Sequence, residues 1–415
     1  MKIIPGGRSS NYLARFGIFF IITAIIIGFP SSYSVGDDNS QPSQNLEIYN
    51  WYDLDAVRDN LSGYHILMND LNSTTEGYEE LASPTANGGK GWQPIGYTKI
   101  VRSCGAGVAS FDYYLRGTFD GQGYEIRDLF INRPDENKVS LFYATLDSGR
   151  IKNIGVTNVT VTGASTIGCL VGWNEGTVDN SYSSGNVNGE VRVGGLVGSN
   201  VGTVLNSYSS GNVNGSSRVG GLAGSNRGGS LNNSHSMCSV IGVDDVGGLV
   251  GYTQGGTVNN SYSTGDVNGN QNVGGLVGLN GVRDAETKSI VRDSYSTSNV
   301  NGNYKVGGLV GHNYYGTVSN SYSTGNVAGY SDVGGLVGKK ALLPTASNSF
   351  WDTETSGQAT SDGGTGKNTT EMKNITTFSE VDWNIIAVAN TTMREPAYIW
   401  NIVNNLTYPF LSWQS

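Results

Sequence analysis

The sequence predicts an all-β fold, a right-handed, single-stranded parallel β-helix (solenoid), and three observations support this prediction. The hexapeptide VGGLVG or a close variant occurs seven times, beginning at residues 167, 193, 219, 246, 273, 306 and 333. A second motif of the form NSYSxGxV follows each of the first six copies. The copies are 26 or 27 residues apart, except for one interval of 33. A regular period of this length is typical of stacked supersecondary units.

Each repeat is expected to form two or three short strands joined by tight turns. Apolar residues do not recur at helical spacing, and the many glycines disfavour a helix because interior glycine costs about 1 kcal/mol relative to alanine. Asn-Gly and Gly-Thr pairs such as Asn268-Gly269 and Gly256-Thr257 are turn signals between the short apolar runs. Twenty-seven residues cannot enclose a core alone, so the units must stack in register, each strand pairing with the coils on either side.

Three columns of equivalent residues support the stacking. The structural leucines are Leu170, Leu196, Leu222, Leu249, Leu276, Leu309 and Leu336. A valine column follows at Val187, Val213, Val240, Val267, Val300 and Val327. A polar column holds Asn180, Asn206, Asn233, Asn260, Asp293, Asn320 and Asn348. Asparagines in register can bond side chain to side chain along a stack, so we expect a ladder in the polar column.

The two motifs together resemble the GLUG motif. The resemblance covers about residues 167–338, where G-L-[apolar]-G is followed by N-S-Y-S-[ST]-G-x-V. It implies a β-helical, adhesin-like surface protein of the exported kind found in bacteria and archaea. Some proteins with such repeats are secreted zinc peptidases, but that association does not extend to this chain. Its histidines are His65, His235 and His312, and none lies in the H-E-x-x-H spacing that places two ligands on one helix face.

The N-terminal region predicts export. Lys2, Arg8 and Arg15 precede an apolar run at Phe16–Phe29, and small residues follow, so we interpret residues 1–34 as a signal peptide. Fourteen apolar residues are short for a membrane span, and an uncleaved N-terminal anchor is the alternative. Residues 35–44 are expected to be a flexible lead-in.

The segments on either side of the regular repeats are expected to act as caps, because an open solenoid end is an exposed sheet edge. Residues 45–114 are expected to hold an N-terminal cap and irregular first coils. An amphipathic helix at Asp53–Leu61, a strand at Tyr64–Leu71 and a long loop at Ser73–Phe111 are expected within them. Residues 115–166 are expected to form less regular coils, and residues 167–340 the GLUG-type coils.

Residues 341–415 are expected to form the C-terminal cap. A short helix is expected within Lys367–Glu380, and the aromatic residues that follow it are expected to cover the last coil. The 33-residue interval carries an insertion near Val282–Ser289. We interpret it as a tolerated surface loop, since loop lengthening costs little; the alternative is a binding loop on one face.

Composition limits the choice of partners. The formal net charge is −9 and the sequence pI is near 4.9, which disfavours nucleic acid and anionic membrane surfaces as partners. A membrane is expected as a partner only through an uncleaved N-terminal segment. Of the three cysteines, Cys169 and Cys238 lie in different columns and on different coils. We therefore expect free, mostly buried thiols and no disulfide framework.

A tyrosine column is the candidate ligand-binding feature. It comprises Tyr182, Tyr208, Tyr262, Tyr295 and Tyr322, with His235 and Phe350 at equivalent positions. If the column faces outward, its rings could stack against sugars; if it faces inward, it is core. Alternation counted from Val267 places Tyr262 outside, whereas alternation counted from Val258 places it inside. The sequence leaves this choice open.

Charged residues supply weaker candidates. The position before each hexapeptide holds Arg192, Arg218, Asp245, Asn272, Lys305 and Asp332. Arg218 is expected to pair with Asp245, and Lys305 with Asp332, as ordinary cross-strand pairs. Asp244 with Asp245, or Asp112 with Asp120, could be a glycosidase-like carboxylate pair, but Asp244 and Asp245 are a poor candidate because neighbours on a strand point to opposite faces. No catalytic residue, metal site or cofactor is expected.

Sequons of the form N-x-S/T are candidate glycosylation sites in an exported protein. They occur at Asn60, Asn72, Asn158, Asn214, Asn232, Asn259, Asn368, Asn374, Asn390 and Asn405.

The preferred functional hypothesis is a secreted or cell-surface, non-enzymatic β-helical protein that mediates adhesion or interacts with the cell envelope, with surface glycans or envelope proteins as partners. The alternative is a polysaccharide lyase or hydrolase on a pectate-lyase-like β-helix, which is analogy at the level of the fold. A third hypothesis is a passive spacer that stacks end to end, which capped ends would oppose.

Overall fold

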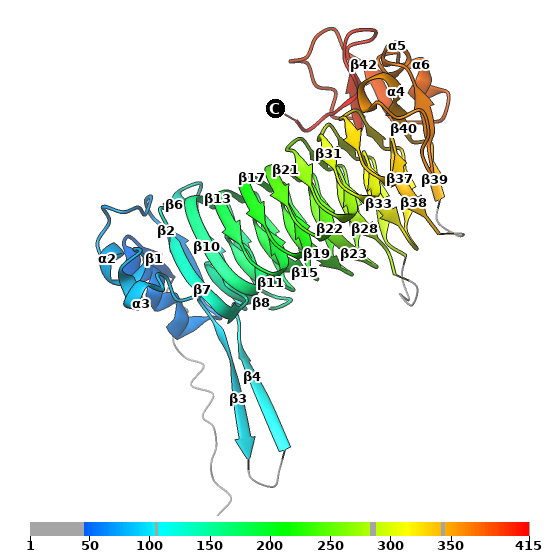
Figure 1. The fold of residues 1–415 in the computed structure, drawn as a ribbon. Coiled ribbons are helices and arrows are strands. Elements are labelled where there is room, and N and C mark those ends of the chain that lie inside the picture. The colour runs from blue at the N-terminus through cyan, green and yellow to red at the C-terminus, as the bar shows by residue number, and fades with distance from the viewer. Residues whose placement is uncertain (1–44, 104–106, 283–287, 342–344, 415) are drawn as a thin grey trace, which may run out of the picture. The chain divides into compact units, whose positions relative to one another are not determined.

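The repeats form a parallel β-solenoid, as the sequence predicts. The computed structural model describes residues 45–103, 107–282, 288–341 and 345–414; the expected signal peptide and lead-in lie outside the described residues. Each regular coil contributes strands to three sheets, here called A, B and C, and sheet C has eight strands (Figure 1). No helix in the described ranges is long and apolar enough to cross a membrane.

Sheet A holds eleven parallel strands and begins at β1, within residues 45–114, where irregular first coils are expected. Its strands in spatial order are β1 (Leu46–Ile48), β2 (Tyr64–Leu67), β5 (Thr118–Asp120), β9 (Arg150–Lys152), β12 (Thr177–Asp179), β16 (Thr203–Leu205), β20 (Ser230–Asn232), β24 (Thr257–Asn259), β29 (Ile290–Arg292), β34 (Thr317–Ser319) and β39 (Thr345–Ser347). The first coils are therefore built in part from residues before Leu115.

Sheet C lies on another side of each coil. Its strands are β8 (Phe142–Thr145), β11 (Val171–Asn174), β15 (Val197–Asn200), β19 (Ala223–Arg227), β23 (Val250–Gln254), β28 (Val277–Asn280), β33 (Val310–Asn313) and β38 (Val337–Lys340).

Sheet B is the widest, because each coil gives it two or three strand segments. Its members are β6 (Glu125–Arg127), β7 (Phe130–Asn137), β10 (Gly155–Ile167), β13 (Tyr182–Asn188), β14 (Val191–Gly194), β17 (Tyr208–Asn214), β18 (Ser217–Gly220), β21 (His235–Ile241), β22 (Asp244–Gly247), β25 (Tyr262–Ser263), β26 (Val267–Asn268), β27 (Gln271–Gly274), β30 (Tyr295–Ser296), β31 (Val300–Asn301), β32 (Tyr304–Gly307), β35 (Tyr322–Ser323), β36 (Val327–Ala328), β37 (Ser331–Gly334), β40 (Phe350–Asp352) and β41 (Thr365–Lys367).

The pairing register joins equivalent residues of successive coils. Val187 pairs with Val213, and Val213 pairs with Val240. All seven structural leucines are fully buried, and the valine column is at most 3% exposed. The apolar columns therefore form one continuous core, to which each coil adds its share of buried area, worth about 25 cal/mol per Å².

A buried amide ladder runs through the corner between sheets C and A. The Asn174 side chain donates to Asn200 (2.7 Å), and Asn200 donates to Asn226 (2.9 Å). One coil further on, Thr253 occupies the equivalent position and donates to Asn280 (2.8 Å). The sequence-predicted ladder at the Asn180 column also exists on some coils, where Asn180 donates to Asn153. The buried ladder was not predicted from the sequence.

Glycine in the hexapeptides is required by close approach of neighbouring coils. A methyl group at Gly221 would collide with the carbonyl oxygen of Gly248 and the hydroxyl of Ser236 on the next coil. Any side chain at this position would force the two coils apart and break the ladder that pairs them.

The N-terminal segment differs in detail from the prediction. The expected helix at Asp53–Leu61 is a short α-helix, α1 (Trp51–Asp55), followed by the 3-10 helix η1 (Ala56–Asn60). Asn50 caps α1 by accepting the amide of Asp53, and Trp51 is fully buried in the solenoid core. The core contact with Trp51, rather than helical periodicity, holds this segment in place. The capping role of both ends stays a prediction.

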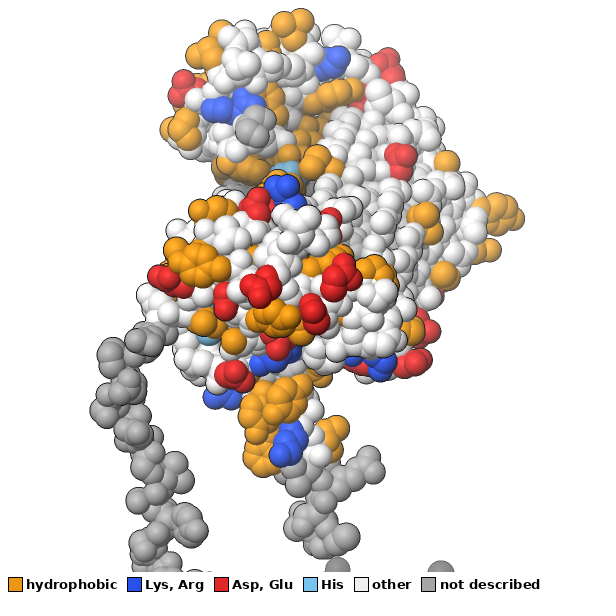
Figure 2. Space-filling view, turned by 90° about the vertical axis from the view of Figure 1, so that its left-hand side faces the viewer, with side chains coloured by type: hydrophobic (Ala, Val, Ile, Leu, Met, Phe, Trp, Pro, Cys, Tyr) orange, Lys and Arg blue, Asp and Glu red, His pale blue; other side chains and the backbone are white. Residues whose placement is uncertain are grey.

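The expected loop at Ser73–Phe111 is wrong, because this segment holds regular elements. It contains two short helices, α2 (Tyr78–Leu81) and α3 (Ala86–Gly89), and most of an antiparallel hairpin. The hairpin strands, β3 (Tyr97–Ser103) and β4 (Gly107–Tyr113), project away from the solenoid (Figure 1). Tyr97 and Phe111 are half exposed, and hydrophobic side chains cover this projection in Figure 2. Alternating residues in both strands were the available sequence signal.

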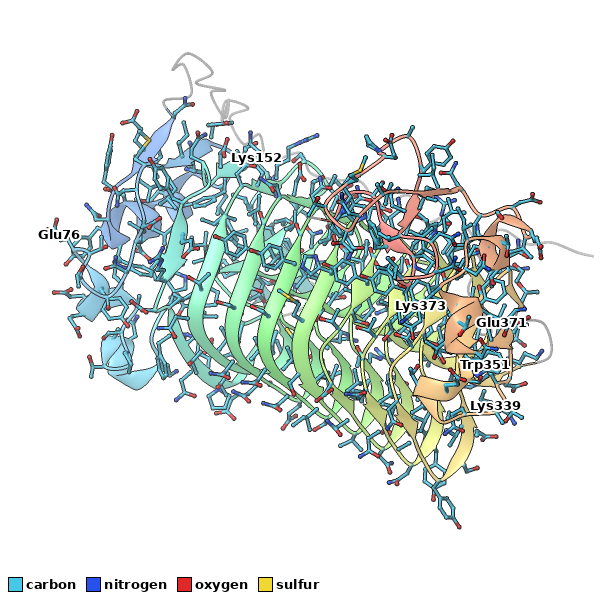
Figure 3. All side chains as sticks on the ribbon, turned by 90° about the horizontal axis from the view of Figure 1, so that it is seen from above. Glu76, Lys152, Lys339, Trp351, Glu371 and Lys373 are labelled. Carbon is cyan, nitrogen blue, oxygen red and sulfur yellow. The ribbon has the colours of Figure 1, made fainter. Side chains whose placement is uncertain are left out.

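The C-terminal segment covers the last regular coil and also packs against the side of the solenoid. Residues 358–364 cover the last regular coil, where the amide of Gly335 donates to Thr360 and the amide of Asp362 donates to Val337 (both 3.0 Å). The helices and remaining strands of the C-terminal segment are α4 (Thr353–Ser356), α5 (Thr369–Met372), α6 (Thr376–Ser379), β42 (Ile385–Ala387), β43 (Trp400–Ile402) and β44 (Phe410–Leu411). Trp351 and Glu371 mark this region in Figure 3. The two short helices α5 and α6 replace the single helix expected at Lys367–Glu380.

We expect Asn200→Ala to lower the free energy of unfolding by about 1–3 kcal/mol, because the Nδ2 of Asn174 and the Oδ1 of Asn226 would lose their buried partner. The control is Asn212→Ala on the same coil, where an exposed amide donates to Asn186 and should cost much less. Urea denaturation of both variants measures the difference. Equal losses would contradict a special role for the buried ladder.

Candidate functional site

The tyrosine column forms a stacked ladder on the outside of sheet B. Successive rings from Tyr182 through Tyr208, His235, Tyr262 and Tyr295 to Tyr322 have centroids 4.6–5.0 Å apart and planes within 10° of parallel. The ladder lies outside the leucine and valine core, and its C-terminal half belongs to a second apolar cluster. The structure thus decides the orientation that alternation left open.

The aromatic C-terminal residues pack on the flank of this ladder, not over the last coil as the sequence led us to expect. The Trp413 ring lies 5.7 Å from Tyr262 and 6.0 Å from His235, and its indole donates to the carbonyl of Asn260 (3.1 Å). Tyr322 is 2% exposed, and its hydroxyl donates to the carbonyl of Pro409. Burial of these large rings attaches the segment to the side of the solenoid.

The N-terminal end of the ladder is less covered. Tyr182 and Tyr208 are partly exposed, and the Tyr182 hydroxyl donates to the carboxylate of Glu125 (2.5 Å). This hydrogen bond, with those from Thr157 and Arg127, lowers the pKa of Glu125. Each ring face contacts the next ring, so the open end presents ring edges and hydroxyls. Sugar stacking on ring faces, which the sequence suggested for this column, would need other aromatics.

The other candidate residues, in the charged column and the carboxylate pairs, do not come together at one site. The charged column shows no ion pair between Arg218 and Asp245 or between Lys305 and Asp332 within the described residues. Asp332 pairs instead with Lys339 (3.0 Å), and Asp245 accepts a hydrogen bond from Asn272 (2.8 Å). The predicted cross-strand pairs are therefore wrong, because these residues have positive φ and their side chains leave the usual strand geometry.

The candidate carboxylate pairs are held by different partners. Asp120 is buried and accepts from Lys152 (2.9 Å), whereas Asp112 accepts from Thr98 (2.8 Å) on the hairpin. No group of three or more His, Cys, Asp or Glu residues that could hold a metal occurs in the described part of the chain. Cys169 and Cys238 are buried and free, and Cys104 lies outside the described residues.

None of the ten sequon asparagines is buried. Five are exposed, and five are partly buried. The exposed ones are Asn60, Asn158, Asn368, Asn390 and Asn405. Glycosylation at these positions stays a prediction.

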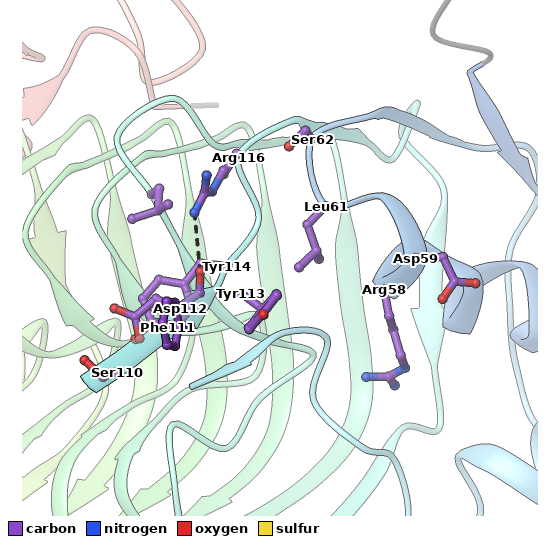
Figure 4. A pocket seen from close by; sticks show the side chains of 11 residues that line it. Arg58, Asp59, Leu61, Ser62, Ser110, Phe111, Asp112, Tyr113, Tyr114 and Arg116 are labelled. Carbon is purple, nitrogen blue, oxygen red and sulfur yellow. Dashed lines mark hydrogen bonds between the residues drawn. The ribbon is translucent and has the colours of Figure 1, made fainter. Parts of the chain in front are cut away.

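A cavity that was not predicted from the sequence lies between η1 and the base of the hairpin. Its volume is about 620 Å³, and Arg58, Asp59 and Arg116 line it together with residues 110–114 of the hairpin (Figure 4). Phe111 is 52% and Tyr113 is 40% exposed, so their rings are free to contact a ligand. The cavity combines open aromatic surface with carboxylates and guanidinium groups, which a uniform run of GLUG coils does not provide.

Fixed contacts hold the walls of this cavity. Arg58 lies over the Trp92 ring (5.1 Å) and donates to the carbonyls of Pro94 and Gln93, so its guanidinium is oriented. Tyr113 stacks on Tyr97 across the hairpin, with centroids 4.6 Å apart and planes 13° from parallel. Preorganised groups lose less entropy on binding. This cavity, which we call the hairpin pocket, is the best candidate for a binding site.

Together these features define a parallel β-solenoid repeat protein with a cavity beside its first coils. The model of the GLUG motif family matches two of its repeats, at residues 244–268 and 302–328.

Two curated proteins are similar to parts of this chain. "Putative Gly-rich membrane protein" from Evansella cellulosilytica is 34% identical over 182 residues, which is 42% of this chain. "Halomucin" from Haloquadratum walsbyi is 31% identical over 102 residues, or 25% of this chain. The matches span 18% and 1% of the lengths of these relatives, so the chain resembles a small part of each.

Two solved structures are similar in fold. One is a "putative immunoglobulin A1 protease" from Bacteroides ovatus, with 17% identity and a TM-score of 0.44 over 91% of this chain and 95% of that chain. The other is an "IgA1 Protease", with 18% identity and a TM-score of 0.46 over 66% of this chain and 21% of that chain. Likeness at this level carries no argument about activity.

His235 gives the ladder a predictable pH dependence. Burial between Tyr208, Tyr262 and Trp413 lowers its pKa from 6.5 to about 4. As the pH falls from 6.5 to 4, the unfolded chain takes up a proton that the folded stack excludes, so stability should fall by up to about 3 kcal/mol.

The matched variant is His235→Tyr, because tyrosine occupies this column on both neighbouring coils. Thermal unfolding of the wild type and the variant from pH 7 to pH 4 measures the effect. We expect the stability of the variant relative to the wild type to increase as the pH falls. A constant difference across this range would contradict the assignment.

Proposed function

We propose that this chain is a non-enzymatic extracellular or cell-surface protein that binds glycans of a cell envelope through the hairpin pocket. The observation that carries the proposal is the combination of exposed Phe111 and Tyr113 rings with charged side chains of η1 and Arg116 around one open cavity. Carbohydrates offer apolar C–H faces and many hydroxyl groups. Aromatic surface suits the faces, and carboxylates and guanidinium groups suit the hydroxyls.

Two further considerations support this proposal. The relatives are named as a membrane protein and as a halomucin, and both names fit a location at the cell surface. The solenoid is also a rigid support, because neighbouring coils are joined by parallel ladders and by the buried amide ladder. A site fixed on such a support binds without reorganising the chain.

The enzymatic alternative has one observation in its favour. Asp59 and Asp112 line the same cavity, and paired carboxylates are the usual catalytic groups of glycoside hydrolysis. Binding without turnover is the expected result for the preferred function, whereas release of reducing ends would support a hydrolase or lyase. A reducing-sugar assay with each bound glycan therefore decides between the two.

We expect Phe111→Ala/Tyr113→Ala to weaken the glycan affinity of the full chain about tenfold or more, because two aromatic contacts would be lost. A glycan array identifies the ligand, and calorimetry with that ligand gives the affinity. The control is Tyr330→Ala, which removes an 82% exposed ring outside the pocket and should change neither binding nor stability. Equal affinity in the wild type and the double variant would overturn the pocket as the site.

A further inference from the structure

Three arginines gather on one flank of the solenoid, and we call them the arginine patch: Arg192, Arg218 and Arg227. Arg192 and Arg218 occupy the same column on β14 and β18, and these strands pair in register. Arg227 ends the sheet C strand β19. Because consecutive coils are about 4.8 Å apart, the two column arginines hold their charges close together.

Asp245 follows Arg218 in the same column, and the positive charge of Arg218 opposes the burial that raises the pKa of the Asp245 carboxyl, but the two side chains form no ion pair. No ion pair involves any of the three arginines within the described residues. Burial lowers the pKa of Arg192, and the charges of Arg218 and Arg227 lower it further, so the three cations repel one another. Like charges directly opposite on neighbouring strands are destabilising. In a chain of net charge −9, three clustered cations without an ion-paired carboxylate are unexpected.

The backbone conformation at Arg192 and Arg218 adds a further energetic cost to these two arginines. Arg192 and Arg218 have φ of 57° and 58°, a left-handed conformation that asparagine and aspartate adopt more readily. The same column holds Asp245, Asn272 and Asp332 on later coils. The fold therefore accepts smaller, cheaper residues here, and it does not itself require the two arginines.

Buried polar atoms without a partner lie beneath the patch. The hydroxyls of Ser199 and Ser225, whose residues are fully buried, and the Nε of Arg192 make no hydrogen bond. Ser199 pairs in register with Ser225, and Gly224 packs against the backbone of Arg192. A buried unpaired polar group costs about 1–3 kcal/mol, so a hydrogen-bonding partner at these atoms would stabilise the cluster.

Tyr252 and Gln254 hold the arginines in place. The Arg218 guanidinium lies 4.4 Å from the centroid of the Tyr252 ring, and the Nε of Arg227 donates to Gln254 (3.2 Å). Tyr252 continues the column of Ser199 and Ser225 on the next coil. Guanidinium groups oriented in this way suit planar or tetrahedral oxyanions, which they bind through two hydrogen bonds at once.

The patch lies on the same flank as the hairpin pocket. Tyr114, which lines the pocket, accepts a hydrogen bond from Lys138 (2.7 Å), and the Lys138 ammonium lies 5.7 Å from the Trp173 ring centroid. Trp173 pairs in register with Ser199. One chain of contacts thus leads from the pocket to the patch, and a linear polymer could follow it.

We propose that the arginine patch binds the carboxylate or sulfate groups of an acidic polysaccharide. The proposal rests on the proposed glycan binding, and it names the chemical class of the glycan. The guanidinium groups donate to the oxyanion. The bound anion also neutralises the mutual repulsion of the three cations.

The test measures binding of polygalacturonate, dextran sulfate and uncharged dextran to the full chain by calorimetry. The variant Arg192→Asn/Arg218→Asn introduces the residue that Asn272 already presents in this column, so it should fold and be at least as heat-stable as the wild type. We expect the wild type to prefer an anionic polymer over dextran. We expect the variant to lose at least about tenfold in that affinity.

The matched control is Lys305→Asn, which removes a cation from the same column outside the patch and should leave the affinity within about twofold. Binding to polygalacturonate alone would identify carboxylate as the preferred group, and binding to dextran sulfate alone would identify sulfate. Equal affinity in the double variant, or no preference of the wild type for either anionic polymer, would overturn the inference. If the inference is overturned but neutral glycans of the array still bind, the proposed function stands. If no glycan binds at all, both the proposed function and the inference about the arginine patch are overturned.

Discussion

The in-register stacking of coils is the constraint on which the rest of the structure depends. Each side chain lies next to its counterpart on the neighbouring coils, so a residue must pack against the residues at the same position on those coils, which are mostly of its own kind. Leucine and valine meet this condition through core packing, and asparagine meets it by donating to one neighbour and accepting from the other. Glycine meets it where two coils approach too closely for a side chain, as at Gly221.

The same constraint explains where function can lie. A column repeated on every coil serves stacking first, and the tyrosine ladder illustrates this because its ring faces are occupied by one another. The candidate binding features lie where the residue type in a column changes or where a segment is added to the repeat. The hairpin adds aromatic surface beside the first coils, and the arginine patch places two like charges on adjacent coils in a column that continues with Asp245, Asn272, Lys305 and Asp332. Both features are local departures from the repeat on an otherwise uniform support.

Several local predictions failed for identifiable physical reasons. Helical periodicity at Asp53–Leu61 ignored Trp51, whose burial in the core begins the helix two residues earlier and leaves its second half as a 3-10 turn. The hairpin was missed because Gly- and Ser-rich surroundings obscured two alternating strands. The C-terminal aromatics were assigned to the solenoid end, whereas they form one apolar cluster with the rings of the tyrosine ladder.

The sequence by itself determined the solenoid, its coil length and its leucine and valine columns, because a repeat that must pair with itself shows its register in the spacing of its residues. Only the tertiary structure decided that the tyrosines face outward, since a left-handed residue such as Asn260 resets the alternation of the strand. It also decided that Trp413 covers Tyr262 and that Arg227 joins Arg192 and Arg218. These contacts join residues of different columns or of segments outside the repeat, and no period in the sequence records them.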